Sequence, residues 1–357
     1  MEENTWVNRV FCKSSEVLAE IPDGSVHTCI TSPPYFSLRE YGHPEQIGLE
    51  PTLDEYVEKL VAVFREVRRT LRDDGTLWLN IGDSWAANRS YRVAQSLHGE
   101  YEIGGRYSGS PVRVPKGLKP KDQMLVPHTV AMALRADGWY LRDTIIWHKP
   151  QCMPSSVRDR TTPAHEYVFL LTKKPRYYYD QGAIREPLAA SSVKRLAQNI
   201  EAQDGSEAYG KTNGAMKAVG TRGPRFGGAK GCDDNPTYSG KSWEPKRRAS
   251  ILSTPPGQSM VSRHGDEIPD SFIGANARSV WTIAPAKYAG DHYAVMPREL
   301  ARRCILAGCP PGGIVLDPFA GTGTTLEVAV GTGRLFVGYE LNPTYCDLIT
   351  DRMGLFS

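Results

Sequence analysis

The sequence has 357 residues, which is enough to bury a complete α/β core and to carry a second module or large insertions. Its 40% hydrophobic and 23% charged residues are typical of a globular protein, and a net charge of +3 does not by itself identify a nucleic-acid-binding protein. The seven cysteines form no C-x-x-C pair, and neither a signal-like N-terminus nor an apolar run of membrane-spanning length occurs. We therefore expect no disulfide framework, no structural zinc and no membrane span, and we favour a reducing cytoplasm.

The first third of the chain predicts a strand that ends in a rigid turn, then a helix and another strand. Val26–Tyr35 is a β-prone run that ends in Ser-Pro-Pro. Thr52 begins a capping box, and apolar residues then recur at helical spacing, so we expect a helix over Leu53–Arg72 with its arginines mostly on the solvated side. Asp74-Gly75 ends this helix, and Thr76–Asp83 predicts a buried strand.

The alternation of helices and strands continues to about residue 180. His128–Asp137 has a helical pattern, whereas Trp139–Trp147 and Glu166–Lys173 are strand-like. We expect Trp139 and Trp147 to lie in the core. Alternating helices and strands predict an α/β fold built on a sheet.

Two segments interrupt this alternation. Ala86–Lys121 is rich in Gly, Ser, Tyr and Arg with little periodicity, so we expect a long loop over 86–121. From Gln181 to Ala275, Gly and Pro recur, and Lys211 to Arg248 holds nine Lys or Arg against three Asp or Glu. This segment is a basic patch within a nearly neutral protein.

The C-terminal segment predicts a nucleoside-binding βαβ half. After a helix over Met296–Gly308, Ile314–Asp317 is an apolar strand, a glycine turn follows, and Gly323–Val330 begins a helix. Arg334–Tyr339 is a second strand, and Glu340 follows it at the distance from the turn where an acid binds both ribose hydroxyls. A plain strand-to-helix connection is the alternative for such a turn.

The residues of the glycine turn favour a nucleoside with a cationic centre over a dinucleotide. Leu326 stands where the third glycine of the dinucleotide fingerprint belongs, and only seventeen residues follow Glu340. Gly321 and Gly323 allow the backbone to approach a ligand closely. Asp317 and Phe319 place a carboxylate and an aromatic ring at the strand end, where they suit a sulfonium.

The Ser32-Pro33-Pro34-Tyr35 turn fits methylation of an aromatic amine. Such an amine is a poor nucleophile because its lone pair is delocalised into the ring, and acceptors on its two hydrogens free that lone pair for attack. The Ser32 hydroxyl and the Pro33 carbonyl are candidate acceptors, and Tyr35 offers a stacking face for an extruded base. Taken alone, the prolines are better explained as the end of a strand, but their combination with the glycine turn reverses this preference.

In these motifs the sequence resembles the amino-methylating DNA methyltransferases of the permuted, beta-type order. The resemblance covers TSPPYFSLREYG, DDGTLWLNIGDSW, GWYLRDTIIWHKP, RTTPAHEYVFLLTKKPRYYYD, DPFAGTGTT and GYELNP. It implies a Rossmann-like fold that binds S-adenosylmethionine, with a mostly parallel seven-stranded sheet between helices. It also implies that 1–180 is the catalytic half of the methyltransferase domain, 181–275 the target-recognition region and 276–357 the cofactor-binding half.

Carried over by motif, the resemblance implies the following site. Ser32, Pro33, Pro34 and Tyr35 form the catalytic loop; Asp317, Phe319, Gly321, Gly323 and Thr324 surround the methionine and sulfonium; Glu340 binds the ribose. In the recognition region, candidate phosphate contacts are Arg222, Arg225, Lys246, Arg247 and Arg248, for which solvated loop charges are the alternative. The chain departs from the family at Phe11-Cys12-Lys13-Ser14, where relatives commonly carry Gly-Asp, so the contact to the cofactor's adenine is not assigned.

The implied substrate is double-stranded DNA. In the family, serine in the first catalytic position is associated more with N4 of cytosine and aspartate more with N6 of adenine, so N4-methylcytosine is favoured and N6-methyladenine is the alternative. A cognate restriction endonuclease is a candidate partner, and the oligomeric state is left open. Scattered histidines such as His128 and His148 predict no metal site, and His165-Glu166 is interpreted as a strand start rather than as cleft lining.

Three further functions compete with this prediction. The glycine turn is also compatible with an NAD-type oxidoreductase, which calorimetric titration of NAD and S-adenosylmethionine would separate. A catalytically silent DNA-binding protein would bind duplexes without methyl transfer. Methylation of RNA or of a protein amide would keep the chemistry and change the substrate.

Overall fold

The computed structural model describes residues 5–38, 43, 45–86, 117–152, 154–155, 157–188, 274–286 and 296–354. Contacts divide the chain into two compact units, one made of Met1–Ile184 with Arg278–Ser357 and the other of Arg185–Ala277. The first unit contains the sheet and all the helices described below. Most of the predicted loop 86–121 and most of the second unit lie outside the described residues, so the recognition role of 181–275 stays a prediction.

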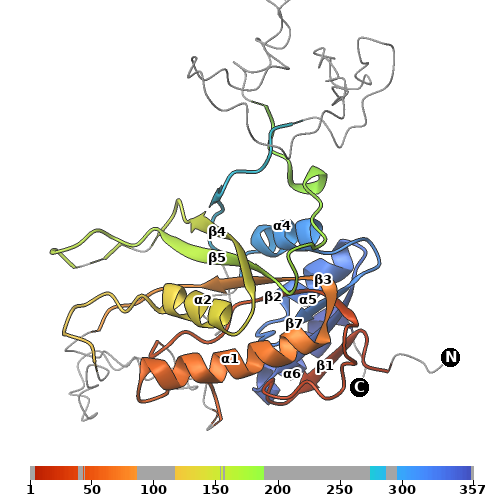
Figure 1. The fold of residues 1–357 in the computed structure, drawn as a ribbon, viewed down its shortest axis with the longest axis horizontal. Coiled ribbons are helices and arrows are strands. Elements are labelled where there is room, and N and C mark those ends of the chain that lie inside the picture. The colour runs from red at the N-terminus through yellow and green to blue at the C-terminus, as the bar shows by residue number, and fades with distance from the viewer. Residues whose placement is uncertain are drawn as a thin grey trace, which may run out of the picture. The chain divides into compact units, whose positions relative to one another are not determined.

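The first unit is built on one sheet of eight strands in the order β1-β8-β7-β2-β3-β5-β4-β6 (Figure 1). The strands are β1 (Arg9–Cys12), β2 (Val26–Thr31), β3 (Leu71–Ile81), β4 (Tyr140–His148), β5 (His165–Thr172), β6 (Val280–Thr282), β7 (Ile314–Asp317) and β8 (Leu335–Glu340). The predicted α/β fold is confirmed, with eight strands in the described part of the chain instead of seven. The additional short strand, β6, pairs in parallel with the end of β4.

The order of the sheet places the two ends of the chain side by side. β7, from the C-terminal segment, pairs in parallel with β2, from the N-terminal segment, so that Cys29 lies opposite Leu316. β3 continues the parallel part beyond β2, whereas β5 runs antiparallel between β3 and β4. Because β2 and β7 are neighbours and run in the same direction, their carboxyl ends open at the same edge of the sheet.

Helices cover both faces of this sheet (Figure 1). They are α1 (Leu53–Thr70), α2 (Val126–Ala136), α4 (Arg298–Gly308), α5 (Thr324–Gly331) and α6 (Pro343–Met353), with a short 3-10 turn at Gly182–Ile184. α1 contacts α2, and α4 contacts α5, as two separate pairs, while α6 packs beside β1 and β8. Successive side chains of β3 point to opposite faces of the sheet. Leu77 and Leu79 pack in the core cluster that includes residues of α1 and α2, whereas Trp78 stacks on Trp281.

The helix predicted from the capping box begins where expected and ends two residues early. Thr52 caps α1, with its hydroxyl accepting from the Glu55 amide at 3.2 Å. The apolar stripe of α1 is buried, and β3 begins directly after it at Leu71, well before the predicted Thr76. The reason is that Leu71 takes part in the sheet by pairing with Val26, which propensity alone does not reveal.

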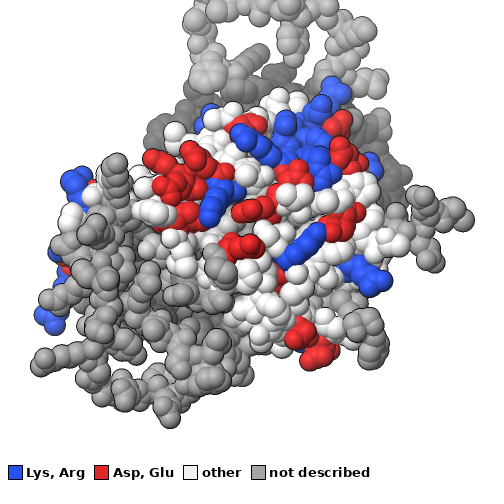
Figure 2. Space-filling model, turned by 90° about the horizontal axis from the view of Figure 1, so that it is seen from below, with Lys and Arg blue, Asp and Glu red and all other residues white. Residues whose placement is uncertain are grey.

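Two arginines of α1, Arg65 and Arg69, pair with acids, whereas Arg68 bonds the Gly138 carbonyl. Arg65 bonds Asp137 at 2.6 Å and Arg69 bonds Glu66 at 3.0 Å, and Arg72 at the start of β3 bonds Asp74 at 3.0 Å. Figure 2 shows blue and red side chains on the same face, with a group of blue ones toward one side. The paired acids offset part of the positive charge of these arginines.

One cysteine pair departs from the prediction. Cys12 at the end of β1 and Cys346 in α6 form a disulfide, although 334 residues separate them in the sequence. The scattered spacing gave no sign of this contact, because it arises only when β1 pairs with β8 and places Cys12 opposite Glu340, six residues before Cys346. The expectation of no disulfide is therefore wrong for this pair.

Two other expectations concern the core and the membrane. Trp139 and Trp147 are both buried, as predicted. Within the described ranges, no helix combines the length and the apolar character that crossing a bilayer requires.

Candidate functional site

The two predicted loops meet at the carboxyl edge of β2 and β7. Thr31 is the last residue of β2 and Asp317 the last of β7, and the Thr31 hydroxyl donates to Asp317 Oδ1 at 2.6 Å. Both side chains are buried. This bond fixes the start of the proline turn against the start of the glycine turn, so the two lie on one site rather than on separate surfaces.

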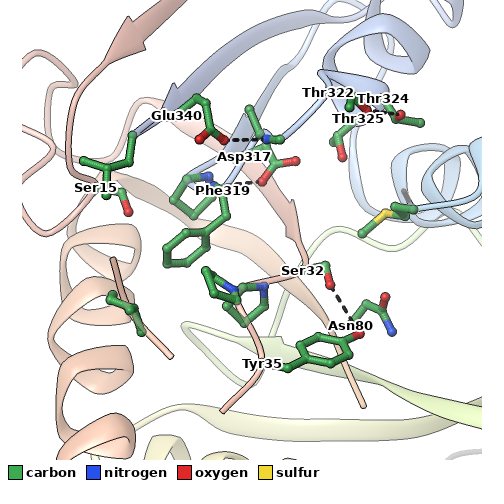
Figure 3. A pocket seen from close by; sticks show the side chains of 18 of the residues that line it. Ser15, Ser32, Tyr35, Asn80, Asp317, Phe319, Thr322, Thr324, Thr325 and Glu340 are labelled. Carbon is green, nitrogen blue, oxygen red and sulfur yellow. Dashed lines mark hydrogen bonds between the residues drawn. The ribbon is translucent and has the colours of Figure 1, made fainter. Parts of the chain in front are cut away.

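A cavity of about 340 Å³ opens where these turns meet, a size in the range of small-molecule sites. Of the predicted residues, the cavity is lined by Ser32, Pro33, Pro34, Tyr35, Asp317, Phe319, Gly321, Thr324 and Glu340. Figure 3 shows Glu340 and Asp317 at one end, Ser32 and Tyr35 at the other, and the ring of Phe319 between them. One pocket therefore brings the glycine-turn acids and the proline turn together.

Gly323 has a different place from the other predicted residues. It does not line the cavity but precedes α5 with a φ of 76°, a conformation that favours glycine. A Cβ at this position would lie 3.0 Å from Ile349 of α6. Its role in the structure is to let the turn pack against α6, so it shapes the pocket only indirectly.

Asp317 is a buried carboxylate without a cationic partner in the described part of the chain. Its side chain accepts from Thr31 and, at 3.1 Å, from the Phe319 amide. Burial raises the pKa of Asp317 to about 6, while hydrogen bonds from Thr31 and Thr325 act in the opposite direction. An enclosed carboxylate with this deficit of positive charge fits a ligand that brings a cation.

Glu340 is oriented by the glycine turn itself. Its Oε2 accepts from the Gly321 amide at 2.8 Å, and its Oε1 accepts from the Asn342 amide at 2.9 Å. Burial raises the pKa of Glu340, and the two amides oppose that shift. Each oxygen keeps a further lone pair for a hydroxyl of a ligand, which is the geometry that a ribose requires.

Part of the proline turn is held from outside, and part is left for a ligand. Tyr56 of α1 donates to the Pro34 carbonyl at 2.8 Å. The Pro33 carbonyl accepts no hydrogen bond from the described residues. The Ser32 hydroxyl donates to Tyr35 Oη at 3.4 Å, so its oxygen lone pairs are available in the cavity. These are the two acceptors that the turn was predicted to offer.

Tyr35 joins a polar cluster at the same end of the cavity. Its hydroxyl donates to Glu166 Oε2 at 2.6 Å, and Asn80 Nδ2 donates to the same oxygen at 3.2 Å. Burial, followed by the charge of Glu166, raises the pKa of Tyr35 well above its usual value. Tyr35 therefore stays protonated and acts as a donor, which fixes the orientation of its ring. Lys149 forms an ion pair with the other oxygen of Glu166.

Sequence reasoning missed this cluster. Glu166 was interpreted as part of a strand start, yet it lines the cavity, while His165 is exposed and does not. Asn80 and Lys149 were not singled out. The sequence signal that could have found them is that each stands at or just beyond the end of a strand, at the edge of the sheet that carries the proline turn. Only the antiparallel pairing of β5 with β3 and β4 brings them together.

The segment that departs from the family's Gly-Asp also reaches the cavity. Lys13, Ser14 and Ser15 line it, and Ser15 is buried and lies at the Glu340 end (Figure 3). The predicted phosphate contacts Arg222, Arg225, Lys246, Arg247 and Arg248 lie outside the described residues. Among the residues that are described, no three His, Cys, Asp or Glu are grouped as metal ligands.

Known proteins match this chain along most of its length. A sequence model of the family described as DNA methylase matches residues 26–351. The Type II methyltransferase M.SmaI of Serratia marcescens is 38% identical over 333 residues, which are 93% of this chain and 85% of that protein. These matches agree with the predicted methyltransferase family and give no support to an NAD-type oxidoreductase.

Solved structures match the fold. A putative DNA modification methylase from Thermus thermophilus, solved with S-adenosyl-L-methionine, aligns with a TM-score of 0.51 and 22% identity over 98% of this chain and 95% of its own. The cytosine-N4-specific PvuII DNA methyltransferase aligns with a TM-score of 0.54 and 16% identity over 98% and 87%. At these identities the alignments establish the architecture alone.

Proposed function

Since this chain belongs to the DNA methylase family, whose amino-methylating members act on N4 of cytosine or N6 of adenine, we propose that it methylates N4 of an extruded cytosine in double-stranded DNA. S-adenosylmethionine is the methyl donor. N6 of adenine is the alternative target. We assign recognition of the target sequence to 181–275, most of which lies outside the described residues.

One observation carries the proposal: the 2.6 Å bond between Thr31 and Asp317. Methyl transfer requires the donor carbon and the acceptor nitrogen to be held in line within a few ångströms. The bond joins the turn that presents acceptors for an amine to the turn that presents acids for a nucleoside. A cavity that contains only one of the two turns would support binding but not transfer.

The glycine-turn half fits S-adenosylmethionine. Glu340 would bind the ribose hydroxyls, Asp317 would face the cationic part of the methionine portion, and Phe319 would line the space between them. When bound, the cofactor supplies an electrophilic methyl group on a sulfonium. The buried carboxylate of Asp317, which has no cationic partner among the described residues, supports this assignment, because burying it without a cation is costly.

The proline-turn half fits the amine. With the base extruded, its two amino hydrogens would be accepted by Ser32 Oγ and the Pro33 carbonyl, which lets the nitrogen lone pair face the methyl group. Tyr35, oriented by Glu166, would stack on the ring of the base. The serine at the first catalytic position supports cytosine N4, which is its more frequent association in the family.

The relatives named as Type II methyltransferases support a role in a restriction–modification system. A cognate endonuclease of the same sequence specificity is then the functional partner. Such an enzyme acts on duplex DNA, and the basic 211–248 segment, with Arg222, Arg225, Lys246, Arg247 and Arg248, is where we propose that phosphates are contacted.

Nucleoside mass spectrometry of DNA tests the proposal. The chain is expressed in a host without DNA methylation, and we expect N4-methylcytosine in the digested DNA. Ser32→Ala should lower its level strongly while the purified protein keeps its affinity for S-adenosylmethionine. If N6-methyladenine is found without N4-methylcytosine, the target base is adenine and not cytosine. Absence of both modified bases from the DNA, or added methyl groups found only in RNA or protein, would reject the proposed function.

A further inference from the structure

We infer that Lys149 reads the extruded base by donating a hydrogen bond to the O2 carbonyl of cytosine, with Glu166 as the positioning residue that holds the ammonium in place. The inference rests on the proposed function and names the group that selects cytosine over adenine. It starts from the polar cluster at the Tyr35 end of the cavity, which the glycine-turn chemistry does not use.

The main chain places Lys149 rigidly at the cavity wall. Lys149 directly follows β4, and its amide donates to the Ala164 carbonyl at 2.7 Å, just before β5 begins. Within the two strands, Trp147 lies opposite Glu166. The side chains of Lys149 and Glu166 are only 22% and 16% exposed, and both line the cavity. A lysine held in this way has little of the freedom of a surface lysine.

The ammonium keeps donor capacity for a ligand. Lys149 forms an ion pair with Glu166 Oε1 and lies 4.6 Å from the centre of the Trp147 ring. An ammonium has three N–H donors, of which the carboxylate takes one and the ring face takes at most one more. At least one N–H is therefore left for an acceptor in the cavity.

Glu166 already accepts three hydrogen bonds, so we assign it to positioning other groups and not to binding the base. Its Oε2 already accepts from Tyr35 at 2.6 Å and from Asn80 at 3.2 Å, and its Oε1 accepts from Lys149. Its negative charge also offsets the ammonium. This matters because positive charge develops on the target amine as the methyl group arrives, and an uncompensated cation nearby would oppose it.

The edges of the two candidate bases differ where Lys149 would reach them. With its amine at Ser32, cytosine presents the acceptors N3 and O2 beyond that amine, whereas adenine presents N1 and then a C2–H group. N3 and N1 are acceptors on both bases, so the two bases differ only at the next position; we place the Lys149 ammonium there, where it finds the O2 carbonyl on cytosine and no acceptor on adenine. A site built around a hydrogen bond rejects an analogue that leaves its polar group unpaired.

Three variants test the inference. Lys149→Met removes the donor and keeps an unbranched side chain, and Lys149→Arg keeps a cationic donor. Lys173→Met is the matched control: Lys173 is 19% exposed, bonds the Leu71 carbonyl at 2.7 Å and faces Asp73, but it lies beyond the opposite end of β5 and outside the cavity. Thermal unfolding and calorimetry with S-adenosylmethionine verify that each variant folds and keeps its cofactor site.

The first readout compares two duplexes that carry the methylation site found by sequencing DNA from the expression host. One has cytosine at the target position, and the other has adenine there. We expect Lys149→Met to lower kcat/KM for cytosine about 10–100-fold and to lower the slow rate on adenine by a much smaller factor, through the loss of the ion pair with Glu166 alone. For Lys149→Arg, kcat/KM on cytosine should lie between the values of Lys149→Met and the wild type. Lys173→Met should match the wild type on both duplexes.

The second readout separates base contact from phosphate contact. A duplex with an abasic target offers the backbone without the base, so Lys149→Met and the wild type should bind it equally. Equal weakening on the cytosine and abasic duplexes would assign Lys149 to the DNA backbone and overturn the inference. Unchanged kcat/KM on cytosine would also overturn it. If the wild type itself produces only N6-methyladenine, the choice of cytosine in the proposed function fails first, before any variant is compared.

Discussion

Thr31 donates a hydrogen bond of 2.6 Å to Asp317 across two neighbouring parallel strands, although 286 residues separate the two in the sequence. The bond is buried, and it connects the strand that leads into the proline turn to the strand that leads into the glycine turn. Its geometry couples the charge state of Asp317 to the position of the catalytic loop.

Thr31→Val should destabilise the protein and shift the titration of Asp317. The substitution keeps the shape of the side chain but removes a donor to a buried carboxylate, which should lower the free energy of unfolding by about 1–3 kcal/mol. Since the Thr31 bond lowers the pKa of Asp317, that pKa should rise above its value of about 6. Urea denaturation and calorimetry with S-adenosylmethionine at several pH values measure both effects.

Thr28→Val is the matched control for that experiment. Thr28 is a buried threonine of the same strand, and its hydroxyl lies 2.8 Å from Thr76 Oγ1, away from the cavity. It should lose stability without a shift in the pH at which cofactor binding weakens. The coupling is refuted if both variants give the same pH profile as the wild type.

Gly82→Ala should lower turnover without weakening cofactor binding. A Cβ at Gly82 would lie 2.7 Å from Cε2 of Tyr35 and 3.2 Å from Cγ of Glu166, so the partly buried Tyr35 ring must move. Displacement of a positioned catalytic group by about 1 Å can cost about 10²-fold in rate. Tritium transfer from labelled cofactor to DNA measures kcat, and calorimetry measures cofactor affinity.

Gly331→Ala gives the comparison for this change, because no other group lies within 4 Å of a Cβ there. It should behave like the wild type in both assays. A Gly82→Ala enzyme of undiminished kcat would show that the orientation of Tyr35 does not matter for transfer.

Much of the fold was predictable because local patterns and long-range contacts agree. The Thr52 cap and the apolar stripe after it predict α1, and the run Ile314–Asp317 is β7 as the structure has it. Where pairing overrides local preference, prediction fails: β1 is only four residues long and is defined by its pairing with β8. The same pairing produces the Cys12–Cys346 disulfide, which spacing could not indicate.

The site divides in the same way. Residues in compact motifs, such as Ser32 and Glu340, were found because their spacing carries the chemistry. Lys149 and Glu166 were not, because each belongs to an ordinary strand end, and their ion pair exists only through the antiparallel pairing of β4 with β5. A sequence pattern reports neighbours along the chain, whereas this cluster is made of neighbours across the sheet.

The affinity for S-adenosylmethionine should rise with pH through about 6. Burial raises the pKa of Asp317 from 3.8 to about 6, so the carboxyl is neutral below that pH and ionised above it. A cationic ligand favours the ionised form, and each pH unit below the midpoint should weaken binding by up to about tenfold. Calorimetry from pH 5 to 8 measures this dependence.

The raised pKa of Asp317 has the opposite effect on the stability of the cofactor-free protein. Between about pH 4 and 6 the folded state binds this proton more tightly than the unfolded state, so the contribution of Asp317 to stability falls as pH rises through that window. Asp317→Asn should remove both dependences. A cofactor affinity that is flat from pH 5 to 8 in the wild type would place the cation away from Asp317.

Glu340→Ala should weaken cofactor binding and leave turnover at saturating cofactor nearly intact. The carboxylate is held by the Gly321 and Asn342 amides at 2.8 and 2.9 Å, which aims its remaining lone pairs at a ligand. Loss of hydrogen bonds to a charged group, worth about 1.5–3 kcal/mol, corresponds to a dissociation constant raised about 10–100-fold. Glu327→Ala is the control, since Glu327 of α5 pairs with Arg352 of α6 and lies outside the cavity. Glu327→Ala should bind the cofactor as the wild type does.

If Glu340→Ala instead lowers kcat at saturating cofactor as much as Ser32→Ala does, Glu340 acts in the transfer step. The division of the cavity into a nucleoside half and an amine half is then wrong.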